Sequence, residues 1–144
     1  LSMTLFSLPA SAYGNGGASV YNSSGTKLGT GDIWTNNKSE SELGKKLSGE
    51  LVSTEKSTLT IKVGYTVVDN MQAGDADTYW AQKTATSATV ISTTKTVSDD
   101  VTPVDARGYF KINSRIARVC KRYNFGDGVS ICSSGPNCEY LGGR

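Results

Sequence analysis

Residues 78–97 read TYWAQKTATSATVISTTKTV, and this stretch decides the fold class. It opens on the aromatic pair Tyr79 and Trp80, and Thr, Ser, Ala and Val then dominate without any Gly or Pro. Because β-branched side chains keep more freedom on a pleated strand than in a helix, the composition predicts a long β-strand. Apolar residues fall on both of its faces in similar numbers, which is typical of a strand at the edge of a sheet.

The segment before it, residues 58–68, shows the clearest strand pattern in the chain. Its apolar positions are Leu59, Ile61, Val63, Tyr65 and Val67, and the residues between them are polar or Gly. A period of two predicts one face in the core and one face in water.

Shorter strands are expected on both sides of this pair. Residues 19–34 predict two strands joined by a turn at 22–25, with Trp34 anchoring the second strand in the core. Residues 13–19 are rich in Gly and are expected to be flexible. Residues 38–47 fit one short helix, with an irregular loop as the alternative.

The C-terminal part resumes the alternation. Residues 106–113 predict a strand with Phe110 inward and Arg107 outward, and a turn at residues 113–114 leads into a further strand. The whole pattern predicts an all-β fold, an antiparallel β-sandwich or small barrel of five to eight strands.

The N-terminus predicts export. Residues 1–12, LSMTLFSLPASA, resemble the end of a secretory signal peptide, with small residues at Ala10 and Ala12. Residues 13–144 would then form a single domain, which the length of 144 residues suits. An apolar N-terminal strand is the alternative. No other apolar run reaches the ~20 residues of a membrane-spanning helix, so we expect no transmembrane segment and a secreted or cell-surface location.

Three cysteines fall in the last 25 residues, at positions 120, 132 and 138. Outside the cytoplasm two of them are expected to form a disulfide. Cys120 and Cys132 flank a hairpin signal at residues 126–128, whereas Cys132 and Cys138 could close a short loop. The third thiol is either unpaired or forms a bridge to another chain.

The chain contains no histidine. This excludes Ser-His-Asp and Cys-His catalysis and imidazole metal ligands. Loop acids such as Asp75 and Asp99 lack the spacing that places two carboxylates across a cleft. We therefore expect a protein that is not an enzyme, and a carboxylate-dependent hydrolase is the least favoured alternative.

One acidic loop invites a calcium interpretation. Its oxygen ligands are Asp69, Asn70, Asp75 and Asp77. Their spacing matches no calcium loop with a known pattern, so a plain acidic loop is expected, with no metal and no cofactor.

Positive charge concentrates at the C-terminus. Residues 105–144 contain seven Lys or Arg against three Asp or Glu, whereas residues 1–104 contain eight against ten. The predicted ligand-binding residues are Arg107, Tyr109, Lys111, Arg115, Arg118, Lys121, Arg122 and Tyr123. Cations beside aromatic rings suit an anionic cell-wall or lipid component. Nucleic acid is not expected, since an exported protein rarely meets it.

The strand segments also resemble a known family. The matching positions are Ser87, Ala88, Thr89 and Val90, then Ala106 and Gly108, then Tyr123, Asn124 and Phe125. Their order over about residues 78–125 is similar to that of the lactococcin 972 type of secreted bacteriocin. The resemblance implies a short β-sandwich that binds a cell-wall precursor without catalysis. Residues 13–16, YGNG, separately resemble the opening of pediocin-like bacteriocins for those four residues only.

Two functions remain in competition at this level. The first is an exported, non-catalytic protein that binds at the bacterial cell envelope or surface, as a bacteriocin-like antimicrobial would. The second is a structural subunit that joins other copies of itself through strand exchange or a disulfide. The basic C-terminal segment favours the first, and the exposed strand at residues 78–97 favours the second.

Overall fold

The computed structural model describes residues 15–35, 46–68, 76–98, 101, 103 and 105–122. Within these ranges the chain is all-β and antiparallel, as predicted. The six strands are β1 (Asn15–Tyr21), β2 (Lys27–Thr35), β3 (Lys46–Val68), β4 (Ala76–Thr96), β5 (Asp105–Ile112) and β6 (Arg115–Arg122). The described ranges contain no helix suited to crossing a lipid bilayer.

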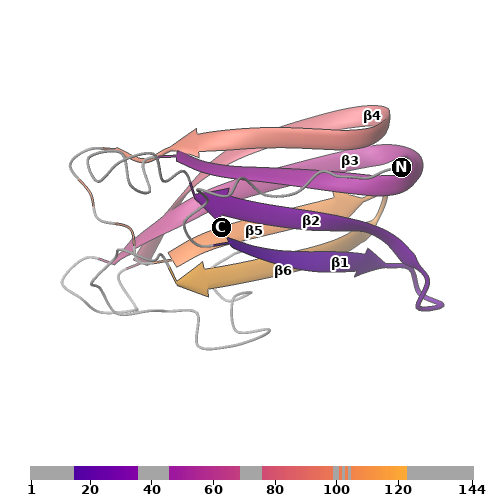
Figure 1. Ribbon diagram of the computed structural model, residues 1–144, viewed down its shortest axis with the longest axis horizontal. Helices are drawn as coiled ribbons and strands as arrows, with labels where there is room; N and C mark the ends of the chain where they lie inside the picture. The colour runs from indigo at the N-terminus through magenta and orange to yellow at the C-terminus, as the bar shows by residue number, and fades with distance from the viewer. Residues whose placement is uncertain are drawn as a thin grey trace.

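Strand β3 is the shared centre of the sheet. Its first half pairs with β2, from Leu47 opposite Thr35 to Ser53 opposite Gly29. Its second half pairs on the same edge with β5, from Leu59 to Thr66. Strand β4 follows the other edge of β3 through both halves, and β1 and β6 extend the sheet beyond β2 and β5 (Figure 1).

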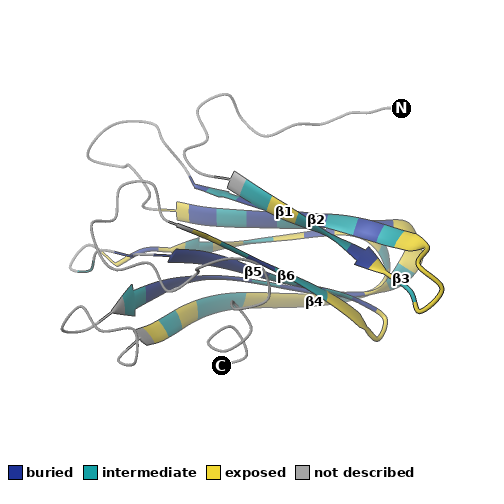
Figure 2. Cartoon of the chain, turned by 90° about the horizontal axis from the view of Figure 1, so that it is seen from below, coloured by how far each residue is buried: buried dark blue, intermediate teal, exposed yellow. Residues whose placement is uncertain are grey.

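The β3–β4 pair bends at a corner, so its two halves lie in different layers (Figure 2). The register shifts between Val52 and Ser57 of β3, and Ser87 of β4 takes a φ of 52°. Ser53 Oγ donates to the carbonyl oxygen of Glu55 at 2.6 Å, and Ser57 Oγ donates to the same oxygen at 2.9 Å. Hydroxyl groups thus bond to backbone where the bulge interrupts the ladder.

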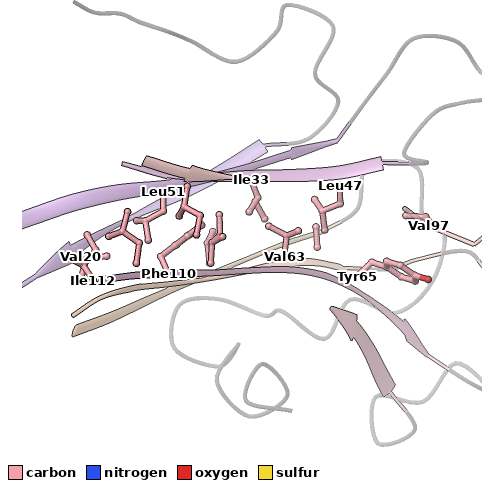
Figure 3. Close-up of a cluster of buried hydrophobic side chains, with 14 residues drawn as sticks. Val20, Ile33, Leu47, Leu51, Val63, Tyr65, Val97, Phe110 and Ile112 are labelled. Carbon is pink, nitrogen blue, oxygen red and sulfur yellow. The ribbon is translucent and has the colours of Figure 1, made fainter. Parts of the chain in front are cut away.

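The core lies between the two layers, as Figure 3 shows. Its buried apolar residues are Val20, Ile33, Leu47, Leu51, Leu59, Ile61, Val63, Tyr65, Ile91, Val97, Ala106, Phe110, Ile112 and Val119. In β3 they occupy odd positions in both halves, so the predicted alternation of residues 58–68 is confirmed and extends back to residue 47. Phe110 points inward as predicted, and Ile112 is buried on the same side.

Glycines on one layer face large side chains on the other. A Cβ on Gly31 would overlap the ring of Phe110, and one on Gly49 would overlap Cγ1 of Val63. These glycines therefore set how closely the two layers approach, because a side chain at either position would occupy space that a side chain of the other layer already fills.

Threonine on β4 has a structural use. On the outer face, Thr84 pairs its hydroxyl with Thr60 at 3.1 Å, and Thr78 pairs with Thr66 at 3.0 Å. Such cross-strand hydroxyl pairs contribute to sheet stability. The Thr-rich composition of β4 thus provides a polar outer face, on which hydroxyl groups of β4 bond to hydroxyl groups of β3.

The sheet is barrel-shaped and nearly closed, because β1 returns beside β6. A Cβ on Gly16 would lie 2.6 Å from Cγ of Lys121 and 3.2 Å from Cγ2 of Val119. Arg115 Nε donates to the carbonyl oxygen of Tyr21 at 3.0 Å. Among the described residues, side chains join β1 to β6 without a backbone ladder.

Three expectations need correction. Trp34 lies on the outer face and is only partly buried, because Ile33 has the inward position in β2. Residues 46 and 47 of the predicted helix begin β3, while residues 38–45 lie outside the described residues. Asn15, Gly16 and Gly17, expected to be flexible, belong to β1.

We predict that Gly31→Ala lowers the free energy of unfolding by about 1–3 kcal/mol, the cost of overpacking a filled core. The cause would be a clash with Phe110, so the same substitution should cost less in a Phe110→Leu background. Urea denaturation of the two single variants and the double variant measures this difference. Thr30→Ala, on the outer face of the same strand, is the control. Equal costs of Gly31→Ala in both backgrounds would contradict the packing explanation.

Candidate functional site

The outer face of β4, β3, β5 and β6 brings together residues that are far apart in the chain. In one row of the register Trp80 lies opposite Gly64, which lies opposite Arg107. In the next row Lys62 lies opposite Tyr109, and Tyr109 lies opposite Arg118. Directly opposite side chains on one face of a sheet are close enough to interact.

Cations and aromatic rings contact one another along this face. Lys62 Nζ lies 6.0 Å from the centroid of the Trp80 ring and 4.8 Å from that of Tyr109. Arg118 Cζ lies 5.3 Å from the centroid of Tyr109. We call Trp80, Lys62, Tyr109 and Arg118 the cation–aromatic row. All four residues are partly exposed, although Nε1 of Trp80 and Nε of Arg118 are buried.

Lys62 is the centre of the row. Ring faces attract an ammonium group electrostatically but leave its unit charge in place. Within the described residues Lys62 makes no ion pair with a carboxylate, so its charge is held in position without being neutralised.

Buried polar residues lie beside the row on the same face. Arg107 is only 2% exposed, and its Nε donates to Oγ1 of Thr66 at 3.0 Å. Thr66 in turn pairs with Thr78, and Asp105 is fully buried two residues before Arg107. Trp80 covers Gly64, where a Cβ would lie 2.7 Å from Cε3 of the indole.

The structure separates the predicted ligand-binding residues into groups. Tyr109 and Arg118 belong to the row, and Lys111 lies on the same face near the end of β5. Arg107 faces outward as predicted, but its burial gives it a structural role in the sheet. Arg115 and Lys121 have the opposite parity on β6 and lie beside β1. The Arg122 side chain and Tyr123 lie outside the described residues.

Two members of the row, Lys62 and Trp80, are absent from the predicted site. The alternation of residues 58–68 places Lys62 on the wet face, which is a usable signal in the sequence. Nothing in the sequence aligns Lys62 with Tyr109, because that neighbourhood depends on the β3–β5 register.

The described residues include only part of the predicted disulfide and of the calcium candidate. Cys120, on β6, is disulfide-bonded, and Cys132 and Cys138 lie outside the described residues, so the pairing stays a prediction. Asp69 and Asp75 also lie outside them, while Asp77 is exposed on β4. The calcium alternative is therefore untested.

A second surface, on the opposite layer, has an acidic pair. Asp32 of β2 lies directly opposite Glu50 of β3. Burial raises the pKa of Asp32, and the charge of Lys27 lowers it by a smaller amount. Burial also raises the pKa of Glu50, and the neighbouring charge of Asp32 raises it further. The pair is a local source of repulsion at neutral pH.

Comparison with protein-family models, curated proteins and solved structures finds no match for this chain. The resemblance to lactococcin 972-type bacteriocins therefore stays a prediction, and function has to be argued from the geometry of the described residues.

We predict that Glu50→Gln stabilises the protein at neutral pH by ~0.2–1 kcal/mol, the scale of exposed cross-strand charge pairs. A raised pKa in the folded state means that ionisation of Glu50 opposes folding above that pKa. Below its ordinary value of 4.5 the carboxyl is protonated in both states and the penalty disappears. The gain from Glu50→Gln should therefore shrink as pH falls through this window.

Urea denaturation from pH 7 down to about pH 4 tests this, within the range where carboxylates titrate. Glu55→Gln, which removes an exposed carboxylate at the corner, is the matched control. A gain that does not depend on pH would show that Asp32 and Glu50 do not repel each other in the folded state.

Proposed function

We propose that the protein is an exported, non-catalytic binding protein of the bacterial cell envelope, and that the cation–aromatic row binds an anionic group there. The observation that carries the proposal is the position of Lys62 between two aromatic rings without a carboxylate partner among the described residues. A positive charge fixed in this way is available to an external anion.

The row offers chemistry of two kinds. Lys62 and Arg118 provide charges suited to phosphate or carboxylate oxygens. The rings of Trp80 and Tyr109 provide flat apolar surface beside these charges. Lipid head groups and phosphate-bearing wall polymers both present an anion next to less polar atoms, so either fits the row.

The absence of histidine supports binding over catalysis, because the usual general base at neutral pH is missing. The signal-like residues 1–12 support export. A bacteriocin-like role is the more specific form of the proposal, and it rests on the resemblance over residues 78–125.

A structural subunit remains the second candidate. It is favoured by strand β4, which pairs along one edge only within the described part of the chain.

We predict that Lys62→Met weakens binding to anionic surfaces about fivefold, since one basic residue near such a surface contributes about 1 kcal/mol. Sedimentation with phosphatidylglycerol vesicles, phosphatidylcholine vesicles and purified cell walls measures the affinity and identifies the source of the anion. Binding should fall as salt rises.

Lys56→Met is the matched control, because it removes the same charge from an exposed position at the corner, outside the row. Equal losses in the two variants would attribute binding to net charge and not to the row. Failure of the wild-type protein to sediment with any of the three preparations at low salt would overturn the proposal.

A further inference from the structure

Within the described part of the chain, one edge of strand β4 has no backbone partner. The strand extends from Ala76 to Thr96, and among the described residues its only backbone partner is β3 (Figure 1). Asp77, Gln82 and Lys83 are exposed along it, as is Thr84. A strand edge of this kind can accept another strand through its free N–H and C=O groups.

Two hydrogen bonds on β3 show which way its backbone groups point. Through the β3–β4 register they also show which backbone groups of β4 face the free edge. Asn113 N donates to the carbonyl oxygen of Thr58 at 2.8 Å, and Thr58 N donates to Oδ1 of Asn113 at 3.1 Å. Both backbone groups of Thr58 therefore point toward β5. Because the direction alternates along a strand, the odd residues Leu59 to Tyr65 bond to β4.

The same alternation extends to β4 through the register. Tyr79 and Ala81 lie opposite odd residues of β3 and bond to them. The backbone groups of Thr78, Trp80 and Gln82 then point to the free edge. Position 80 can accordingly form a hydrogen-bonded pair with a strand added at this edge.

The charges on this part of β4 are self-complementary. Before the bulge at Ser87 the strand has one acidic residue, Asp77, and one basic residue, Lys83. They lie three residues before and three residues after Trp80. A two-fold axis at Trp80 would place Asp77 of each copy opposite Lys83 of the other, in non-hydrogen-bonded pairs where side chains approach most closely.

Neighbouring registers lose this match. A two-fold axis at Lys83 would oppose the two Lys83 side chains. An axis at Ala81 would place Lys83 opposite Tyr79 and leave both charges without a partner.

We propose that a second copy of the chain pairs antiparallel with β4 across a two-fold axis at Trp80, forming one continuous sheet. Directly opposite residues share a face, so the two Trp80 indoles become neighbours and the two cation–aromatic rows lie on the same side. With the axis at Trp80, residues 76–84 of each copy lie opposite one another, and this range ends before the bulge at Ser87. This assembly does not depend on the nature of the ligand, and it would double the binding surface.

Light scattering of the full chain over a range of concentrations tests the assembly. We expect the wild-type mass to rise to that of a dimer. Gln82→Pro removes an N–H that faces the free edge and no bond to β3, so this variant should remain monomeric with an unchanged circular dichroism spectrum. A wild-type protein that stays monomeric up to its solubility limit would overturn the proposal, and so would a Gln82→Pro variant that dimerises as tightly as wild type.

A charge exchange tests the register. Asp77→Lys and Lys83→Asp each replace two opposite-charge pairs by two like-charge pairs, and each should weaken self-association about tenfold. An equimolar mixture of the two variants restores both opposite-charge pairs in a heterodimer and should recover the wild-type affinity. Lys56→Asp, at the exposed corner, is the control for net charge. A mixture that associates no better than either variant alone would rule out the two-fold axis at Trp80.

Discussion

The rest of the structure depends on the bend in the β3–β4 pair. A straight strand of 23 residues would be more than twice as long as the strands of globular proteins usually are. The bulges at residues 52–57 and at Ser87 turn the second half of β3 over the first. Since inward positions stay odd on both sides of the corner, the apolar faces of the two halves meet and form the core.

The bend also fixes the place of each other strand. Strands β2 and β5 both pair with the same edge of β3, one in each layer, and β1 and β6 then meet at the far side. Strand β4 is left on the opposite edge of both layers. The exposure of β4 is thus a consequence of the topology, which agrees with the mixed polarity of its two faces in the sequence.

The fold class, the hairpin turn at residues 113–114 and the alternation of residues 58–68 could be predicted because they depend on local patterns. The errors arose where tertiary packing decides. Trp34 is the larger side chain, but Ile33 is inward because the parity of β2 is fixed by Gly31, which has to face Phe110. From sequence alone Gly31 reads as a residue that weakens a strand. The outward direction of Arg107 is predicted correctly. Its burial depends on residues of neighbouring strands, which no local sequence pattern identifies.

The candidate site shows the same limit in a stronger form. Clustering in sequence grouped Arg115, Arg118 and Lys121, although a period of two sends Arg118 to one face and the other two toward β1. The interacting set is instead transverse to the strands and joins Lys62 to Tyr109, 47 residues later, through register. A long bent strand favours such an arrangement, because one of its faces runs alongside three neighbouring strands. Trp80 belongs both to this set and to the open edge of β4, so any strand that pairs at this edge extends the face on which the cations lie.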